Sequence, residues 1–394
     1  MTADLDGFAR TQLATLADAG RRRELRPTRA LDGRRVERDG GVLVDFSSND
    51  YLGLARDPEV MEAAHAALET HGAGAAASRL ITGDHPEHAA LEAELAALKG
   101  SEDAVVFGSG FLANLGILTA LAGRHDLILA DRLNHACLVD GARLSGARVL
   151  RYPHADPAAV RERLQRYRAD HRHCLIVTDG VFSMDGDLAP LAELAALARE
   201  YDCWLMTDDA HGVGVVGDGA GSTRAAGLGA DEVPLQMGTL SKAAGGYGGY
   251  LCASRPVAEL VRNRARSFVY TTALPPATVA GDRAAVARIR RDRDLCRRPL
   301  ALARRLAGRL GLPDPVSPIV PVVLGEDRTA VAAQRTLEET GYLVQAIRPP
   351  TVPEGTARLR ITLRAPHAES DVDGLADALA PLLPAAAAAG SAAR

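Results

Sequence analysis

The chain has 394 residues, enough for two or three domains, and 47% of them are hydrophobic, which is ordinary for a soluble globular protein. A net charge of −4 gives no basic surplus for nucleic acid, and no apolar run is long enough to span a bilayer. Five scattered cysteines without a CxxC pair predict reduced thiols in a cytoplasmic protein.

The first two parts of the chain have different patterns. The opening MTADLDGFARTQLATLADAGRRRELR is amphipathic, with acidic residues first and basic residues last, and lacks the order of a signal peptide. From about residue 103 to 255, short apolar runs such as AVVFG, DLILAD and CLIVTDG alternate with helical patterns such as APLAELAALAREYD. This alternation predicts an α/β fold with a mainly parallel central sheet and helices on both faces.

A smaller α+β unit is predicted at the C-terminal end. A long helical stretch from about Pro275 to Leu310 precedes PIVPVVL, a helix, YLVQAI, ARLRITL and a final helix. We therefore expect an N-terminal helix and arm (1–50), a large domain (51–270) and a small C-terminal domain (271–394). Sites in such sheets gather at the carboxyl ends of the strands.

One lysine stands out by its rarity. Only Lys99 and Lys242 are lysines among the 46 basic residues, so arginine is used almost everywhere else. Lys99 ends a helical pattern, where a cation is favourable. Lys242 lies in MGTLSKAAGGYGGY, and an amine can attack a carbonyl whereas a guanidinium cannot. The pattern predicts that Lys242 is chemically reactive.

The motif FGSGFLAN follows a predicted strand and opens a predicted helix. Its glycines and the free N–H groups of the helix could cradle a phosphate. The spacing also fits a dinucleotide fingerprint, with Asp131 about 20 residues on. A simple tight turn is the third interpretation, and this stretch alone does not decide among them.

Acids and histidines follow several predicted strands. Asp208 and His211 lie in LMTDDAHGVG, the acids of TDGVFSMDGD follow another strand, and His135 follows DLILAD in NHAC. Singly, each is as easily a surface or structural residue. HPEH and HRHC lack a second cluster at ligand spacing, so no metal site is predicted. GDGAGS (217–222) is expected to be a turn.

Together, a reactive lysine, an anion cradle, a strand-end carboxylate and a strand-end histidine match the needs of pyridoxal 5'-phosphate (PLP).

Eight motifs in order make the chain resemble the α-oxoamine synthases, PLP enzymes of the type I aminotransferase fold. The resemblance covers about residues 20 to 380 and implies a homodimer. The motifs are FSSNDYLGL (46–54), FGSGFLAN, NHAC, DGVFSMDGD, DDAHGVG, GTLSKAAGGYGGY, YTTALPP and AIRPPTVPEGTARLRITL.

The resemblance implies three catalytic residues: Lys242 binds the cofactor aldehyde, Asp208 faces the pyridine nitrogen and His135 stacks on the ring. Thr271 and Thr272 are implied to reach the phosphate held by the partner subunit. The other implied cofactor contacts are Gly110, Phe111, Ser183, His211 and Thr239. The implied substrate contacts are Arg21, His135, Thr351 and Arg360, of which Arg360 holds the amino-acid carboxylate. Asp179 stands where many relatives carry glutamate.

The double proline and TVPEGTARLR most resemble the acyltransferases that condense L-alanine with a pimeloyl thioester in biotin biosynthesis. The expected partners are L-alanine and pimeloyl-CoA or pimeloyl acyl carrier protein. Three alternatives stay open: condensation of glycine with a short acyl-CoA, an NAD-dependent dehydrogenase built on GSGFLA, and a non-catalytic subunit. Such a subunit would be expected to lose Lys242.

Overall fold

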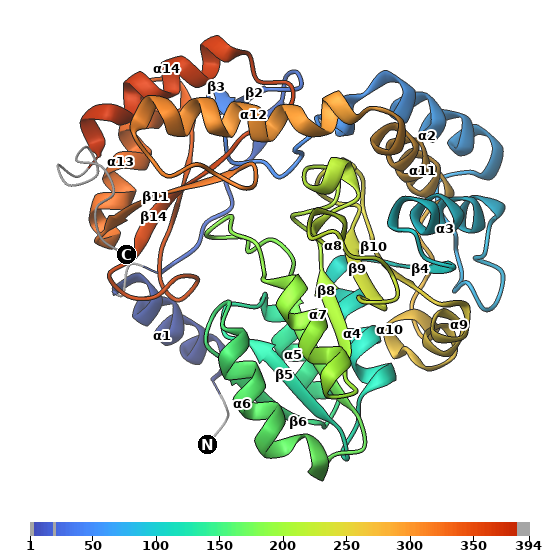
Figure 1. The fold of residues 1–394 in the computed structure, drawn as a ribbon. Coiled ribbons are helices and arrows are strands. Elements are labelled where there is room, and N and C mark those ends of the chain that lie inside the picture. The colour runs from blue at the N-terminus through green and yellow to red at the C-terminus, as the bar shows by residue number, and fades with distance from the viewer. Residues whose placement is uncertain (1–3, 19–20, 384–394) are drawn as a thin grey trace.

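The computed structural model describes residues 4–18 and 21–383, and its centre is a mainly parallel sheet (Figure 1). Within these residues, seven strands lie in the order β4-β10-β9-β8-β7-β5-β6. β10 is antiparallel to both of its neighbours, and the other pairs are parallel. The strands are β4 (Asp103–Phe107), β5 (Leu127–Asp131), β6 (Arg148–Tyr152), β7 (Cys174–Asp179), β8 (Trp204–Asp208), β9 (Leu235–Thr239) and β10 (Gly249–Ala253).

Helices cover both faces because the strands are apolar on both faces. In β7, Leu175 and Val177 join one hydrophobic core, while Ile176 joins another. The first core is closed by α4 (Gly110–Leu121), α5 (Ala136–Leu144), α9 (Arg255–Arg264) and α10 (Arg266–Val269). The opposite face is closed by α3 (Pro86–Lys99), α6 (Pro157–Tyr167), α7 (Leu191–Glu200) and α11 (Pro276–Arg291). α11 packs on α2 (Pro58–His71). The predicted sheet with helices on both faces is confirmed.

A smaller antiparallel sheet, β11-β14-β13, lies apart from the central sheet (Figure 1). It shares one core with α12, α13 and α14. The chain's N-terminal arm forms a second small sheet, β1-β2-β3, to which β12 adds in parallel. The elements are β1 (Thr28–Ala30), β2 (Arg35–Arg38), β3 (Gly41–Asp45), β11 (Ile319–Gly325), β12 (Tyr342–Leu343), β13 (Gln345–Ile347), β14 (Ala357–Thr362), α12 (Arg293–Leu310), α13 (Asp327–Glu339) and α14 (Glu369–Leu379).

Two expected elements are divided in the structure. The helical stretch expected from Pro275 to Leu310 is broken at Asp292, whose side chain accepts a hydrogen bond from Leu295 N at 3.0 Å and so caps α12. YLVQAI forms β12 and β13, which belong to different sheets.

The predicted N-terminal helix is α1 (Leu5–Asp18), which buries no residue in this chain. The domain boundaries stay predictions.

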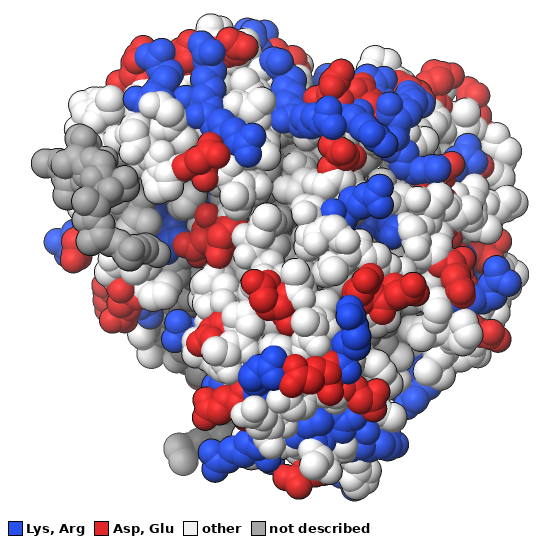
Figure 2. Space-filling view, viewed as in Figure 1, with Lys and Arg blue, Asp and Glu red and all other residues white. Residues whose placement is uncertain are grey.

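Ion pairs join two helices at the surface of the small domain. Arginines form a band along the top of the molecule, where α12 runs (Figure 2). Arg305 pairs with Asp373 at 2.7 Å, and Arg309 pairs with Asp377 at 2.6 Å, so α12 is joined to α14. In the described part of the chain, no helix has the length and apolar character to cross a membrane.

A buried histidine makes the small domain sensitive to acid. His367 Nδ1 accepts from Arg364 N at 3.1 Å, Nε2 donates to Asp45 O at 3.0 Å, and the ring lies 4.1 Å from that of Phe46. Burial lowers the pKa of His367 to about 4. The folded state therefore holds this ring neutral, and the stability it contributes at neutral pH is lost as pH falls below the unfolded pKa.

We predict that His367→Gln removes this acid sensitivity. The free energy of unfolding of wild type, relative to the variant, should fall by about 2 kcal/mol between about pH 7.5 and about pH 5. Urea unfolding at a series of pH values measures this difference. His65→Gln, at an exposed histidine, is the control and should give a profile parallel to wild type. Parallel profiles for His367→Gln would contradict the prediction.

Candidate active site

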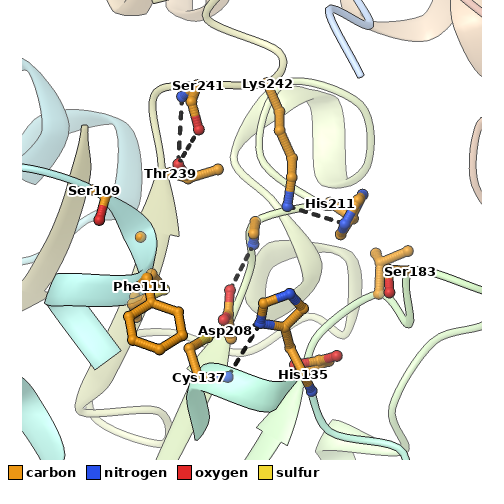
Figure 3. Close-up of a pocket in the computed structure, with 15 residues that line it drawn as sticks. Ser109, Phe111, His135, Cys137, Ser183, Asp208, His211, Thr239, Ser241 and Lys242 are labelled. Atoms are coloured by element: carbon orange, nitrogen blue, oxygen red, sulfur yellow. Dashed lines mark hydrogen bonds between the residues drawn. The ribbon is translucent and has the colours of Figure 1, made fainter. Parts of the chain in front are cut away.

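A cavity of about 180 Å³ opens at the carboxyl edge of the central sheet. β7, β8 and β9 end there, and α4 and α5 begin there. The structure brings eight of the predicted residues to the cavity wall (Figure 3). They are Gly110, Phe111, His135, Ser183, Asp208, His211, Thr239 and Lys242.

Lys242 lies in the turn after β9, and its side chain points toward His211 (Figure 3). Its Nζ is 3.0 Å from His211 Nε2. Burial lowers the pKa of Lys242, and the nearby charge of Arg360 lowers it further, against the opposite effect of Asp208. A lowered pKa increases the fraction of neutral amine near neutral pH, and the neutral amine is the nucleophile and the base.

His211 connects Lys242 to a buried tyrosine. Tyr51 Oη lies 2.6 Å from His211 Nδ1, on the other side of the ring from Lys242. Burial and the charges of Lys242 and Arg360 hold the pKa of His211 well below its usual value. The ring is therefore neutral, with one nitrogen donating and the other accepting.

Asp208 is a fixed, buried carboxylate at the end of β8. Its Oδ2 accepts from Asn114 Nδ2 at 2.7 Å, and its Oδ1 accepts from Ala210 N at 3.0 Å. Asp179 stands opposite it on β7. Burial and the charge of Asp208 raise the pKa of Asp179 well above its usual value. Of the two carboxyls, Asp208 can therefore serve as the anion that faces a cationic ring nitrogen.

His135 caps the start of α5. Its Nδ1 accepts from Cys137 N at 3.3 Å and lies 2.8 Å from Cys137 Sγ. Burial lowers the pKa of His135. These contacts fix the plane of a neutral ring at the cavity wall, as stacking on a flat ligand requires.

The start of α4 and the end of β9 form an anion cradle. Ser109 caps α4, because its hydroxyl accepts from Leu112 N at 3.2 Å. The N–H groups of Gly110 and Phe111 come before this capped N–H, and the first N–H groups of a helix have no partner within the helix. A Cβ at Gly110 would lie 3.4 Å from Thr239 Oγ1. Thr239 and Ser241 hydroxyls meet at 2.8 Å. This supports the phosphate interpretation of FGSGFLAN.

Arg360 brings a positive charge from β14 of the small domain. Its guanidinium donates to Ser183 O at 2.5 Å, Asn49 Oδ1 at 3.1 Å and Tyr51 Oη at 3.5 Å. All these acceptors are neutral, and none of the described carboxylates forms an ion pair with Arg360. The guanidinium can therefore receive a ligand carboxylate.

Five predicted residues do not line this cavity: Arg360, described above, and Thr271, Thr272, Thr351 and Arg21. Thr271 and Thr272 line a second, smaller cavity with Arg79. Thr351 lines a cavity of about 920 Å³ that shares Ser183 with the first. Arg21 is exposed and lies 3.9 Å from Glu354 in the loop that carries Thr351.

The sequence analysis did not single out Tyr51, Asn114 or Cys137. Each lies inside a quoted motif, FSSNDYLGL, FGSGFLAN or NHAC. The motifs therefore indicated the segments that contain these residues. Only the structure shows that Tyr51 contacts His211 and that Asn114 contacts Asp208.

Comparison with known proteins decides the family. The model of the aminotransferase class I and II family matches residues 42–379. An 8-amino-7-oxononanoate synthase of Methylobacterium nodulans is 57% identical over 97% of this chain and 98% of its own length. That of Maricaulis maris is 56% identical over 98% and 99%. This chain belongs to the 8-amino-7-oxononanoate synthase family.

Solved structures agree with this family. A serine palmitoyltransferase (SPT) of Sphingomonas wittichii has a TM-score of 0.90 and 31% identity, covering 97% of this chain and 98% of its own. Another SPT structure contains PLP, with a TM-score of 0.90, 29% identity and coverage of 97% and 98%. The 8-amino-7-oxononanoate synthase of Francisella tularensis has a TM-score of 0.73 and 28% identity, covering 86% and 97%. The predicted family, type I fold, acyltransferase class and PLP cofactor are confirmed.

We predict that Tyr51→Phe lowers kcat about tenfold, because His211 Nδ1 loses a buried partner worth about 1.4 kcal/mol. Steady-state turnover at saturating substrates measures it. Tyr250→Phe is the matched control, since Tyr250 Oη is buried without a hydrogen-bond partner among the described residues. Its kcat should stay within about twofold of wild type. Equal kcat values for wild type and Tyr51→Phe would show that the contact is not used.

Proposed function

We propose that this chain condenses L-alanine with a pimeloyl thioester, of CoA or of acyl carrier protein, to 8-amino-7-oxononanoate and carbon dioxide in biotin biosynthesis. One observation carries the proposal: a buried lysine at the cavity is joined through His211 and Tyr51 to an arginine that forms no ion pair with any of the described carboxylates. A base and a carboxylate receptor are what a reaction at the α-carbon of an amino acid requires. The relatives' names supply the choice of substrates.

The residues present fit PLP. Lys242 would bind its aldehyde, Asp208 its ring nitrogen and His211 its phenolic oxygen, while His135 would stack on the ring. Gly110, Phe111, Ser183 and Thr239 would complete the contacts, and Thr271 and Thr272 would reach the phosphate across the subunit boundary. When bound, PLP supplies an aldehyde for the amino acid and a ring that withdraws electrons from its α-carbon.

Each protein group then has a defined task. Arg360 binds the carboxylate of alanine through parallel N–H donors and so fixes the direction of the α-hydrogen. Lys242, whose pKa is lowered by burial, takes the α-proton at Nζ from its neutral form. Asp208 would face the ring nitrogen, where a carboxylate favours a bound proton. Neutral His211 holds Nζ at hydrogen-bond distance.

The larger cavity is suited to the acyl chain. Phe182, Val320, Val322 and Val352 give it apolar walls, and Ser183 places it beside the site of chemistry. Thr351 lies at this cavity, and Arg21 lies near its loop, so both would contact the thioester substrate. A long chain gains about 0.8 kcal/mol for each methylene that it buries.

We also propose a cytoplasmic homodimer. Ala273 N donates to Ala77 O at 3.0 Å, which places YTTALPP against the loop that carries Ile81. Leu80, Ile81 and Tyr270 are exposed there although they are large and apolar. Such an apolar patch beside the smaller cavity favours contact with a second copy. The division into residues 1–50, 51–270 and 271–394 belongs to the same proposal.

We predict that Lys242→Arg lowers turnover at least about a thousandfold although it keeps a basic side chain, because a guanidinium cannot capture an aldehyde. Borohydride treatment followed by intact mass measurement should leave cofactor attached to wild type and not to the variant. Wild type treated without cofactor is the control. Turnover of Lys242→Arg close to wild type would remove Lys242 from its proposed role.

We predict that alanine with pimeloyl thioester is the best substrate pair. Glycine should react more slowly by roughly 10- to 200-fold, since one methyl group is worth about 1–3 kcal/mol. Each methylene removed from the acyl chain should lower kcat/KM by roughly fourfold. An assay of amino acids against a ladder of acyl thioesters measures both trends. Faster reaction of glycine with acetyl- or succinyl-CoA would identify a different α-oxoamine synthase.

We predict a dimer in sedimentation at micromolar concentration. Ile81→Asp should shift the protein toward monomer and lower turnover, because it places a charge in the proposed apolar contact. Val323→Asp, at a half-exposed valine of the small domain, should leave the dimer intact. A fully active wild-type monomer would contradict the proposal.

A further inference from the structure

The chain's other lysine is also buried. Lys99 ends α3 as the sequence predicts, but its side chain has no exposed surface. Its Nζ lies 2.7 Å from Asp209 Oδ2 and donates to Ala220 O at 2.6 Å. The interaction of a cation with the helix dipole accounts for a lysine at the end of α3, but it explains neither of these two contacts.

Asp209 closes the loop that carries His211. Ser222 N donates to its carboxylate at 3.0 Å, and Asp209 N donates to Met237 O at 2.9 Å. Residues 209–222 therefore form a loop whose two ends are joined through one carboxylate. GDGAGS, expected to be a simple turn, provides the second end of this loop and the carbonyl that Lys99 contacts.

The space around the pair admits an ammonium group and little more. Gly221 has φ +97°, and a Cβ there would overlap Asp209 Oδ2 and lie 2.8 Å from Lys99 Nζ. A Cβ at Gly212 would overlap Asp209 Oδ1. A guanidinium is larger and planar, so it does not fit where this compact charge fits. This accounts for a lysine in a chain that otherwise uses arginine.

The loop sets two contacts of the active site. Ala210, next to Asp209, donates from its N–H to Asp208 Oδ1 at 3.0 Å. His211, the following residue, holds Nε2 3.0 Å from Lys242 Nζ. Ala210 is one residue and His211 two residues from Asp209 along the chain. A shift of the Asp209 backbone would therefore move both contacts.

We propose that Lys99 is a positioning residue: through Asp209 it fixes the 209–222 loop so that Asp208 and His211 keep their working geometry. Lys99 touches neither cofactor nor substrate. The proposal rests on the proposed PLP chemistry of this site. Without the amine, Asp209 is a buried carboxylate lacking its counter-charge, a strongly unfavourable state that the loop relieves by moving.

The test compares Lys99→Met, Lys99→Arg and wild type as holoenzymes. Both variants should lower kcat at least about tenfold while each KM stays within about twofold, because the pair contacts no substrate. Titration of the apoenzymes with PLP should show at least about tenfold weaker binding, since Asp208 loses its alignment. Lys99→Arg keeps the charge, so its failure to restore either value isolates the fit of the ammonium group.

Leu95→Ala is the matched control for lost stability. Leu95 is fully buried on α3, one turn before Lys99, and belongs to the core rather than to the Asp209 contacts. This variant should lower Tm as Lys99→Met does, yet keep kcat and PLP affinity within about twofold at a temperature where it is folded. If Lys99→Met keeps wild-type kcat, or if Leu95→Ala loses as much, the proposal is overturned.

Asp209→Asn decides the question if Lys99→Met does not fold. It keeps the size of the side chain and removes its charge, and the same losses of kcat and PLP affinity are expected; wild-type values would overturn the proposal. The amino acid and thioester that wild type turns over fastest serve as substrates, and PLP titration needs none. A wrong choice of alanine or pimeloyl thioester therefore leaves this test valid.

Discussion

The proposed chemistry depends on one constraint: the amine of Lys242 must be able to lose its proton in a cavity that also holds charges. Burial of Lys242 lowers its pKa, while Asp208 acts in the opposite direction and Arg360 adds to the effect of burial. Neither charge forms an ion pair with Nζ, which lies 3.0 Å from Nε2 of the neutral His211 ring. A direct carboxylate partner would stabilise the ammonium and suppress both nucleophile and base.

The fold meets this constraint by drawing on separate segments. β8 supplies Asp208, the loop after it supplies His211, and the turn after β9 supplies Lys242. Arg360 comes from β14 of the small domain, and the segment between β3 and α2 supplies Tyr51. Segments this far apart in sequence can meet because parallel strands place their carboxyl ends at one edge.

The sequence was sufficient for much of this. Strands apolar on both faces, such as CLIVTD, are recognisable without a structure, and so is a single lysine among glycines and hydroxyl residues. Tyr51, Asn114 and Lys99 could not be assigned, because their roles depend on contacts across 160, 94 and 110 positions of the chain. The break at Asp292 was missed because the helical pattern continues on both sides of one capping residue.

The chain of contacts from Lys242 through His211 and Tyr51 to Arg360 has a consequence for timing. The charge of Arg360 lowers the pKa of both Lys242 and His211. A carboxylate that binds Arg360 neutralises this charge, so the proton affinity of both groups rises on binding. Arg360 thus favours the neutral form of Lys242 while no carboxylate is bound, and a bound carboxylate makes the same amine a stronger base.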